Sequence, residues 1–221
     1  MTVTPVLVVG ESGTGKSTMF KDLPPARTLV LNTENKSLPF ANADQFCQVR
    51  IETYQELEAY LDMALSPEGV AAYDYVILDS FTSATEIINR FVEFAFRGYD
   101  QWKNYNSIIV DIIIKLKKMQ QQVFIVAIPE QKDVGFNEFK AYARIKGKEL
   151  KFGYLEKEMA IVLFTNPVYE LETGEMDGVE MLYRPNKNTT SKSPVGMFES
   201  RPENNALIIS EAIKAYYGRI G

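Results

Sequence analysis

The sequence predicts an α/β fold with a mainly parallel central sheet flanked by helices, in a single domain spanning residues 1–221. Short apolar runs alternate with segments of helical periodicity, which is typical of a sheet covered by helices on both faces. A glycine-rich run, GESGTGKS at residues 10–17, directly follows the first apolar run. The 221 residues, 46% of them hydrophobic, suffice for one substantial core and are too few for two large domains.

The predicted strands are short apolar runs bounded by polar or turn-forming residues. They cover residues 4–9, 28–31, 45–51, 73–79, 123–128 and 159–165. A β-hairpin is expected after the last of these strands, with arms at 168–172 and 180–184. Gly174 and Gly178 would lie in its turn region.

Helical segments separate these strands. A short helix is expected from the glycine-rich run to about residue 22, where two consecutive prolines would end it. Thr53 and Glu56 form a capping-box pattern, which predicts a helix ending near residue 65, with 66–69 closing it. Further helices are expected through about residue 96, over 101–121 and over 210–217.

Two late regions depart from this alternation. Residues 130–157 are polar and charged with weak periodicity, which predicts a loop. Residues 167–198 comprise the late hairpin and a basic, polar loop. The chain shows no internal repeat and no low-complexity linker, so one domain is the economical interpretation.

The run GESGTGKS matches the pattern G-x-x-x-x-G-K-[ST] of a phosphate-binding loop. Its glycines let the backbone curl around a phosphate chain with the N–H groups pointing inward, and the N-terminus of the next helix adds positive partial charge. Lys16 would reach the β- and γ-phosphates, and Ser17 would place its hydroxyl on Mg²⁺. The residues expected to bind the nucleotide are Gly10, Ser12, Gly13, Thr14, Gly15, Lys16, Ser17 and Thr18.

Carboxylates follow three of the predicted strands, at the edge of the sheet where ligands bind. Asp79 ends the strand 73–79 and would hold Mg²⁺ indirectly, through water and Ser17. Glu34 is the first candidate for the base that activates the attacking water. Glu130 competes for that role, and Gln131 could sense the γ-phosphate.

Cations gather in two later segments. Between residues 132 and 151 they interleave with aromatic residues, which suits single-stranded nucleic acid, although a solvated loop accounts for the pattern equally well. The candidate nucleic-acid contacts are Lys132, Lys140, Arg144, Lys146 and Lys148. In the second segment, Lys187 and Lys192 could reach the γ-phosphate of a neighbouring subunit, contact nucleic acid, or do neither.

Composition excludes several classes of protein. The absence of histidine excludes catalytic triads that need one and argues against a zinc site. The single cysteine excludes an intramolecular disulfide and favours a reducing cytoplasm. No apolar run is long enough to cross a membrane, and no secretory signal opens the chain. A net charge of −5 is unusual for a constitutive nucleic-acid binder, although local patches decide binding.

With these residues the chain resembles the RecA-like P-loop ATPases, and most of all the compact phage nucleotide-binding proteins linked to single-strand annealing and recombination. The resemblance implies that Lys16, Ser17 and Asp79 serve ATP and Mg²⁺ and that Glu34 activates water. It implies a mobile DNA-binding loop at 130–157, and Lys187 and Lys192 acting across subunits. One departure is Pro129-Glu130, where related proteins often carry a histidine. The segments that carry the resemblance are GESGTGKST, LVLNTEN, YDYVILDSFTS, VFIVAIPEQ and RPNKNTTSKSPVGMF.

The resemblance further implies a homo-oligomeric ring or filament on single-stranded DNA, with ATP between subunits. It would act in the cytoplasm of the host cell, with a single-strand DNA-binding protein as a candidate partner. Two alternatives stay open. One is a nucleotide-gated assembly or partner-binding ATPase without DNA affinity, which the acidic pI favours. The other is a small-molecule kinase that uses the late basic loop as a lid, although no separate lid domain is evident.

Overall fold

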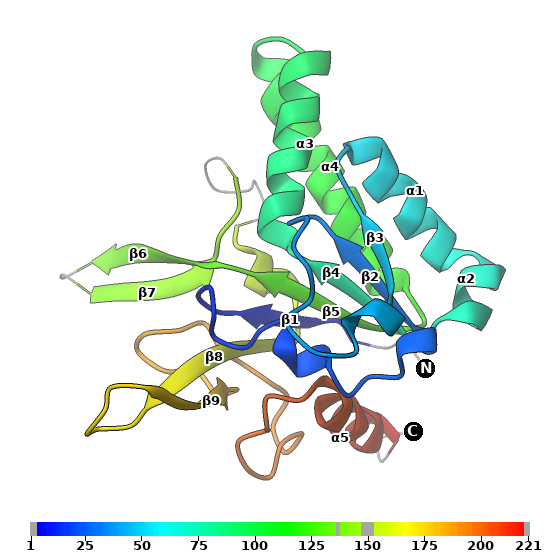
Figure 1. Ribbon diagram of the computed structural model, residues 1–221. Coiled ribbons are helices and arrows are strands. Elements are labelled where there is room, and N and C mark those ends of the chain that lie inside the picture. The colour runs from blue at the N-terminus through cyan, green and yellow to red at the C-terminus, as the bar shows by residue number, and fades with distance from the viewer. Residues whose placement is uncertain (1–3, 136–137, 147–152, 219–221) are drawn as a thin grey trace.

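The computed structural model describes residues 4–135, 138–146 and 153–218, and shows a seven-stranded sheet with helices on both faces (Figure 1). The strand order is β3-β2-β4-β5-β1-β8-β9, and every neighbouring pair is parallel except β8 with β9. The predicted α/β class is therefore confirmed. The strands of this sheet are β1 (Val6–Val9), β2 (Thr28–Asn32), β3 (Cys47–Arg50), β4 (Tyr75–Asp79), β5 (Gln122–Ala127), β8 (Ile161–Tyr169) and β9 (Met176–Leu182).

The core lies on both sides of the central strands, because alternate side chains point to opposite faces. In β1, Leu7 and Val9 pack into the cluster that contains residues of α1, α3 and α4, while Val6 and Val8 pack into the cluster that contains residues of α5. All four are fully buried, which explains why such strands are apolar throughout. The helices are α1 (Tyr54–Leu65), α2 (Pro67–Ala72), α3 (Phe81–Ala95), α4 (Tyr99–Lys118) and α5 (Ala206–Gly218).

The start of α1 follows the predicted capping box. The backbone N–H of Glu56 donates to the Thr53 hydroxyl at 3.2 Å, and the N–H of Thr53 donates to the Glu56 carboxylate at 3.0 Å. α1 ends at Leu65, as predicted, and the segment that closes it also starts α2, where Ser66 accepts a hydrogen bond from Gly69 and Pro67 occupies the first helical position.

The helix expected after the glycine-rich run is only a 3₁₀ turn, Thr18–Phe20. Leu23 is buried against the core, and the prolines that follow stop the chain before an α-helix can be completed. The positive partial charge that a full helix supplies to a bound phosphate is correspondingly smaller here. Phosphate binding at this loop therefore depends more on the loop N–H groups and on Lys16.

Residues 129–143 form an antiparallel hairpin, whereas the sequence predicts a loop there. Its strands are β6 (Pro129–Gly135) and β7 (Glu138–Ala143). Most of β6 is exposed, so this strand shows none of the apolar alternation from which a half-buried strand is predicted, although β7 buries Ala141 and Ala143. The hairpin projects from the body of the molecule as one of two arms (Figure 1).

The second arm is the hairpin β8–β9, which was predicted with shorter strands (Figure 1). β8 continues past residue 165 to Tyr169, so the expected strand 159–165 and the first arm of the hairpin are one strand. Gly178 pairs with Val168 inside β9 and does not lie in the turn. Among the described residues, no helix is long and apolar enough to cross a membrane.

Candidate nucleotide-binding site

A cavity of about 360 Å³ lies at the carboxyl ends of the central strands, between the glycine-rich loop and the segment that follows β2. Parallel strands that end at one edge of a sheet bring their following residues together there. The cavity is lined by Ser12, Gly13, Gly15, Lys16, Ser17, Thr18, Asn32, Glu34, Lys36, Ser37, Leu38, Pro39, Asp79 and Ile128.

The glycine-rich loop is held against β8 by close packing and neutral hydrogen bonds. A Cβ atom at Gly10 would lie 1.7 Å from the Thr165 hydroxyl, so only glycine fits there. The Thr14 hydroxyl lies 2.6 Å from that of Thr165 and donates to the Glu11 carbonyl at 2.8 Å. Gly10 and Thr14, both expected to bind nucleotide, therefore support the loop from beneath, while the other six expected residues line the cavity.

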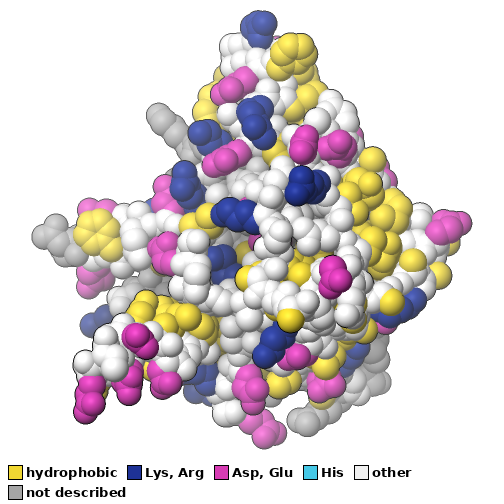
Figure 2. Space-filling model, in the orientation of Figure 1, with side chains coloured by type: hydrophobic (Ala, Val, Ile, Leu, Met, Phe, Trp, Pro, Cys, Tyr) yellow, Lys and Arg dark blue, Asp and Glu magenta, His cyan; other side chains and the backbone are white. Residues whose placement is uncertain are grey.

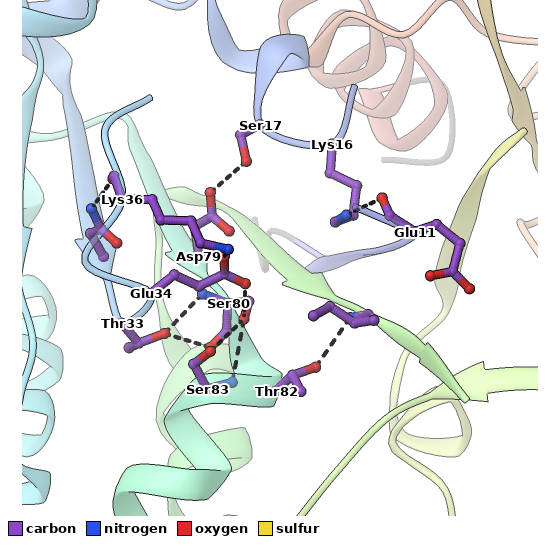
Figure 3. Close-up of polar contacts among 12 residues, drawn as sticks. Glu11, Lys16, Ser17, Thr33, Glu34, Lys36, Asp79, Ser80, Thr82 and Ser83 are labelled. Carbon is purple, nitrogen blue, oxygen red and sulfur yellow. Dashed lines mark hydrogen bonds and ion pairs between the residues drawn. The ribbon is translucent and has the colours of Figure 1, made fainter. Parts of the chain in front are cut away.

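The Lys16 ammonium lies within the loop and donates to the carbonyl oxygen of Glu11 at 2.6 Å (Figure 3). Burial lowers the pKa of Lys16, and the negative charges of Asp79 and Glu34 oppose that shift. The amine is thus held in a partly dehydrated site that faces two carboxylates. A phosphate group there would gain a strong charge-assisted hydrogen bond.

Ser17, in the loop after β1, and Asp79, at the end of β4, come together in the cavity. The Ser17 hydroxyl donates to the Asp79 carboxylate at 2.7 Å (Figure 3). Burial raises the pKa of Asp79, and the Ser17 hydrogen bond opposes that shift. A hydroxyl and a carboxylate are oxygen ligands of the kind that Mg²⁺ prefers, so the pair fits a magnesium ion shared with nucleotide phosphates.

Glu34 is fixed beside this pair by two hydrogen bonds. Its carboxylate accepts from the Ser80 hydroxyl at 2.9 Å and from the Lys36 ammonium at 3.0 Å (Figure 3). Burial acts to raise the pKa of Glu34, but these two hydrogen bonds outweigh it and the pKa is lowered. Thr33 joins the two strand ends, since its hydroxyl donates to the Ser80 carbonyl at 2.6 Å.

The other candidate carboxylate lies elsewhere. Glu130 is on β6 opposite Tyr142, and its closest cation is Lys132 at 3.7 Å. Gln131 pairs with Ala141 in the same hairpin. Neither residue lines the cavity, whereas Glu34 does.

The predicted trans-acting cations also lie outside the cavity of their own chain. Lys187 is exposed in the loop after β9. The backbone of Lys192 pairs with Val162, so this part of the loop extends the edge of the sheet beside β8.

The predicted nucleic-acid contacts are spread over the β6–β7 hairpin and the chain that follows it. Lys132 and Lys140 face each other across the hairpin, and the Lys132 ammonium lies 4.7 Å from the centre of the Tyr154 ring. Arg144 and Lys146 come after β7, and the backbone of Lys146 is bound by Thr85 and Tyr105. Lys148 lies outside the described residues.

Two residues of the site escaped the sequence analysis. Lys36, which binds Glu34, follows it by two residues, and this short spacing of opposite charges could have indicated the ion pair. Asn204 donates from its side-chain amide to the carbonyl of Gly15 at 3.0 Å, across 189 residues of sequence. No local pattern marks Asn204, because its role depends on the segment before α5 lying against the loop.

The fold and the site together define a P-loop nucleotide-binding protein of RecA-like architecture. β5 lies between the strand that carries the loop and the strand that carries Asp79, and both motifs open onto one cavity. Residues 4–195 match the family described as AAA domain, and the chain belongs to that family. This membership supports binding of ATP, with Mg²⁺ as its usual companion.

Comparison with solved structures supports the fold. A KaiC-like protein from the hyperthermophilic archaeon Pyrococcus horikoshii superposes with a TM-score of 0.50 and 14% sequence identity. The match covers 86% of this chain and 82% of the archaeal chain. A comparison with curated protein sequences found no match.

Proposed function

We propose that the protein binds ATP·Mg²⁺ in this cavity and hydrolyses it, with Glu34 activating the attacking water. The observation that carries the proposal is the meeting of three elements at one sheet edge: Lys16 in the loop, the Ser17–Asp79 pair, and the oriented carboxylate of Glu34. These are a phosphate-binding cation, oxygen ligands for a metal ion, and a general base.

Each residue has a distinct part in the proposed reaction. Lys16 and the loop N–H groups hold the phosphates and favour the charge that develops on them. Ser17 and Asp79 would hold Mg²⁺, which supplies positive charge to the phosphate oxygens. Glu34, oriented by the hydrogen bond from Ser80, accepts a proton from water.

We further propose that the protein acts on single-stranded DNA during annealing or recombination of a phage. Copies would assemble head to tail with ATP between them, so that Lys187 or Lys192 of one copy reaches the ATP of the next. Support comes from the β6–β7 hairpin with its cations and aromatic rings, which begins directly after Ile128, a residue of the ATP cavity.

One observation favours a partner-binding ATPase without DNA affinity. The β8–β9 hairpin carries five carboxylates and no cation between residues 166 and 180, and acidic side chains gather on the outer part of that arm (Figure 2). The fifth, Glu180, lies nearer the base of the hairpin and forms an ion pair with Arg201. Such an arm repels nucleic acid and suits a basic protein surface.

Binding to labelled single-stranded DNA, measured against salt with and without ATP·Mg²⁺, separates the two functions. The DNA-binding proposal predicts tight, ATP-dependent binding. The logarithm of the association constant should fall steeply with the logarithm of the salt concentration, with a slope of about −0.7 per phosphate contact. Absence of binding at low salt, with ATP hydrolysis intact, would favour the partner-binding function.

A further inference from the structure

A second cavity, of about 340 Å³, lies beside the nucleotide cavity and has Glu34, Lys36 and Ile128 in common with it. It is bounded by the segment that follows β2, by α3 and by the chain that follows β7. ATP binding and hydrolysis leave this cavity without a role. The rest of its lining consists of Thr33, Thr82, Ser83, Glu86, Ile87, Arg90 and Arg144.

Two arginines line this cavity from different elements. Arg90 lies on α3 two turns after Ser83, so both are on the same face of the helix. The backbone of Arg144 is fixed, because its N–H donates to the Ile128 carbonyl at 2.8 Å and its carbonyl accepts from Thr82 at 3.0 Å. Within the part of the chain that the structure describes, neither guanidinium donates a hydrogen bond or forms an ion pair.

The charge of the lining suits an anion. Glu34 is already bound by Lys36, which leaves Glu86 as the single further carboxylate of the lining against two arginines. The fork of a guanidinium matches the oxygens of a phosphate group, and Ser83 adds a hydroxyl donor. Lys and Arg side chains also gather on the surface along α3 and at its junction with the β6–β7 hairpin (Figure 2).

We propose that this second cavity binds a backbone phosphate of single-stranded DNA, and that the bound phosphate draws Lys36 away from Glu34. This inference rests on the proposed function, since it assumes Glu34 as the base and DNA as the partner. It adds a site for the phosphate and a route by which that site controls hydrolysis.

Lys36 is suited to this exchange. It lines both cavities, and its side chain is 73% exposed, so its ion pair with Glu34 is of the weak, solvent-screened kind. An anion in the second cavity therefore competes effectively for the ammonium. Without the hydrogen bond from Lys36, the Glu34 carboxylate is a stronger base toward water.

The test compares ATP turnover with and without oligothymidylate in three proteins. These are the wild type, the double variant Arg90→Gln/Arg144→Gln, and the control Arg97→Gln/Lys103→Gln, which removes two cations at the exposed junction of α3 and α4. We expect DNA to raise turnover about tenfold or more in the wild type and the control, and to have little effect in the double variant. Arg90→Gln alone, a change at an exposed helix position, is expected to lose part of the stimulation.

Lys36→Met tests the route itself. Turnover at saturating ATP without DNA is expected to rise, and DNA is expected to add little. Unchanged turnover without DNA, together with full stimulation by DNA, would show that Lys36 does not restrain Glu34 and would overturn the proposal.

Two further results distinguish this inference from the function on which it rests. Full DNA stimulation in the Arg90→Gln/Arg144→Gln variant would overturn the cavity as the site and leave a DNA-stimulated ATPase intact. Stimulation by inorganic phosphate in the absence of any effect of DNA would overturn DNA as the source of the anion. A wild-type protein without ATP turnover would contradict the proposed function and this inference with it.

Discussion

The two walls of the nucleotide cavity are built from different kinds of contact. The wall of β1 and β8 is held by neutral hydrogen bonds, such as Thr14 with Thr165 and Asn204 with the Gly15 carbonyl. The wall of β2 and β4 also contains neutral hydrogen bonds between Thr33 and Ser80, but it carries ionisable groups in contact with other side chains: Glu34 with Lys36, and Asp79 with Ser17 of the opposite wall. The first wall keeps its shape whatever the pH, whereas the second carries groups whose charge can change.

This difference suggests that one wall determines the affinity for ATP and the other determines the rate of hydrolysis. Substitutions in the first wall are expected to change the affinity for ATP and to leave turnover of bound ATP nearly intact. Substitutions in the second wall are expected to change turnover. Lys16 belongs to the loop of the first wall but faces the carboxylates of the second.

The largest effect is expected from Glu34→Gln. Loss of a general base lowers the turnover number by about 100- to 10,000-fold, while the amide preserves the shape of the wall and hence the affinity for ATP. Single-turnover hydrolysis and equilibrium binding of a fluorescent ATP analogue measure the two quantities.

Glu130→Gln is the matched control, because Glu130 is a carboxylate just beyond β5 that does not line the cavity. It is expected to turn over normally. Normal turnover in Glu34→Gln, with loss of turnover in Glu130→Gln, would transfer the role of base to Glu130.

Lys16→Ala is expected to weaken ATP binding about 100-fold, because a charge-assisted contact with the phosphates is lost. Titration calorimetry gives the Kd, and Lys21→Ala, an exposed lysine just after the loop, is the control. An unchanged Kd in Lys16→Ala would show that the nucleotide does not bind in this cavity.

Asn204→Ala tests the wall of β1 and β8, and a smaller effect is expected. The Gly15 carbonyl loses a hydrogen bond, so the affinity for ATP is expected to fall about three- to tenfold, with turnover at saturating ATP unchanged. Asn104→Ala, on the exposed side of α4, controls for general effects. A fall in turnover without a change in Kd would break the division between the walls.

The smallest effect expected is a shift in pH dependence. Burial acts to raise the pKa of Glu34, yet the hydrogen bonds from Lys36 and Ser80 lower it overall, so Glu34 is a carboxylate at neutral pH. Turnover is expected to be lost only as the pH falls through that lowered pKa. Lys36→Met removes one of these hydrogen bonds, so the acid limb of the turnover profile should move to higher pH. An acid limb that stays in place would show that Lys36 does not set the charge of Glu34.

The same shift makes a contribution to stability with a definite sign. Because the pKa of Glu34 is lower in the folded than in the unfolded chain, its contribution is fully present above the unfolded pKa and is lost as the pH falls through the folded one. Thermal melting of the wild type and Lys36→Met over the acid range would measure it.

Much of the architecture could be predicted because it is encoded locally. Each central strand is an apolar run, the capping box starts α1, and the glycine-rich loop has a fixed pattern. The β6–β7 hairpin was not predicted because β6 is exposed and polar and so lacks apolar alternation, and β7 buries only two small side chains, Ala141 and Ala143. The loop motif is usually followed by an α-helix. Here the packing of Leu23 and the prolines that follow it limit this segment to a 3₁₀ turn.

The site was predictable in its parts but not in its connections. Lys16, Ser17, Glu34 and Asp79 could be chosen from motif and strand-end position, and the structure brings them to one cavity. The partners that orient them depend on distant folding. Asn204 reaches Gly15 only because the segment before α5 pairs with β9 at Glu203 and Glu180.

The acidic β8–β9 arm gives the molecule an uneven distribution of charge. Its five carboxylates equal the net charge of −5 of the whole chain, so the remainder of the protein is close to neutral. Groups of like negative charge repel one another over roughly 10 Å in about 0.1 M salt, so neighbouring copies are expected to keep these arms apart. The arm therefore restricts the orientations in which a second copy, or any polyanion, can approach the face that carries ATP.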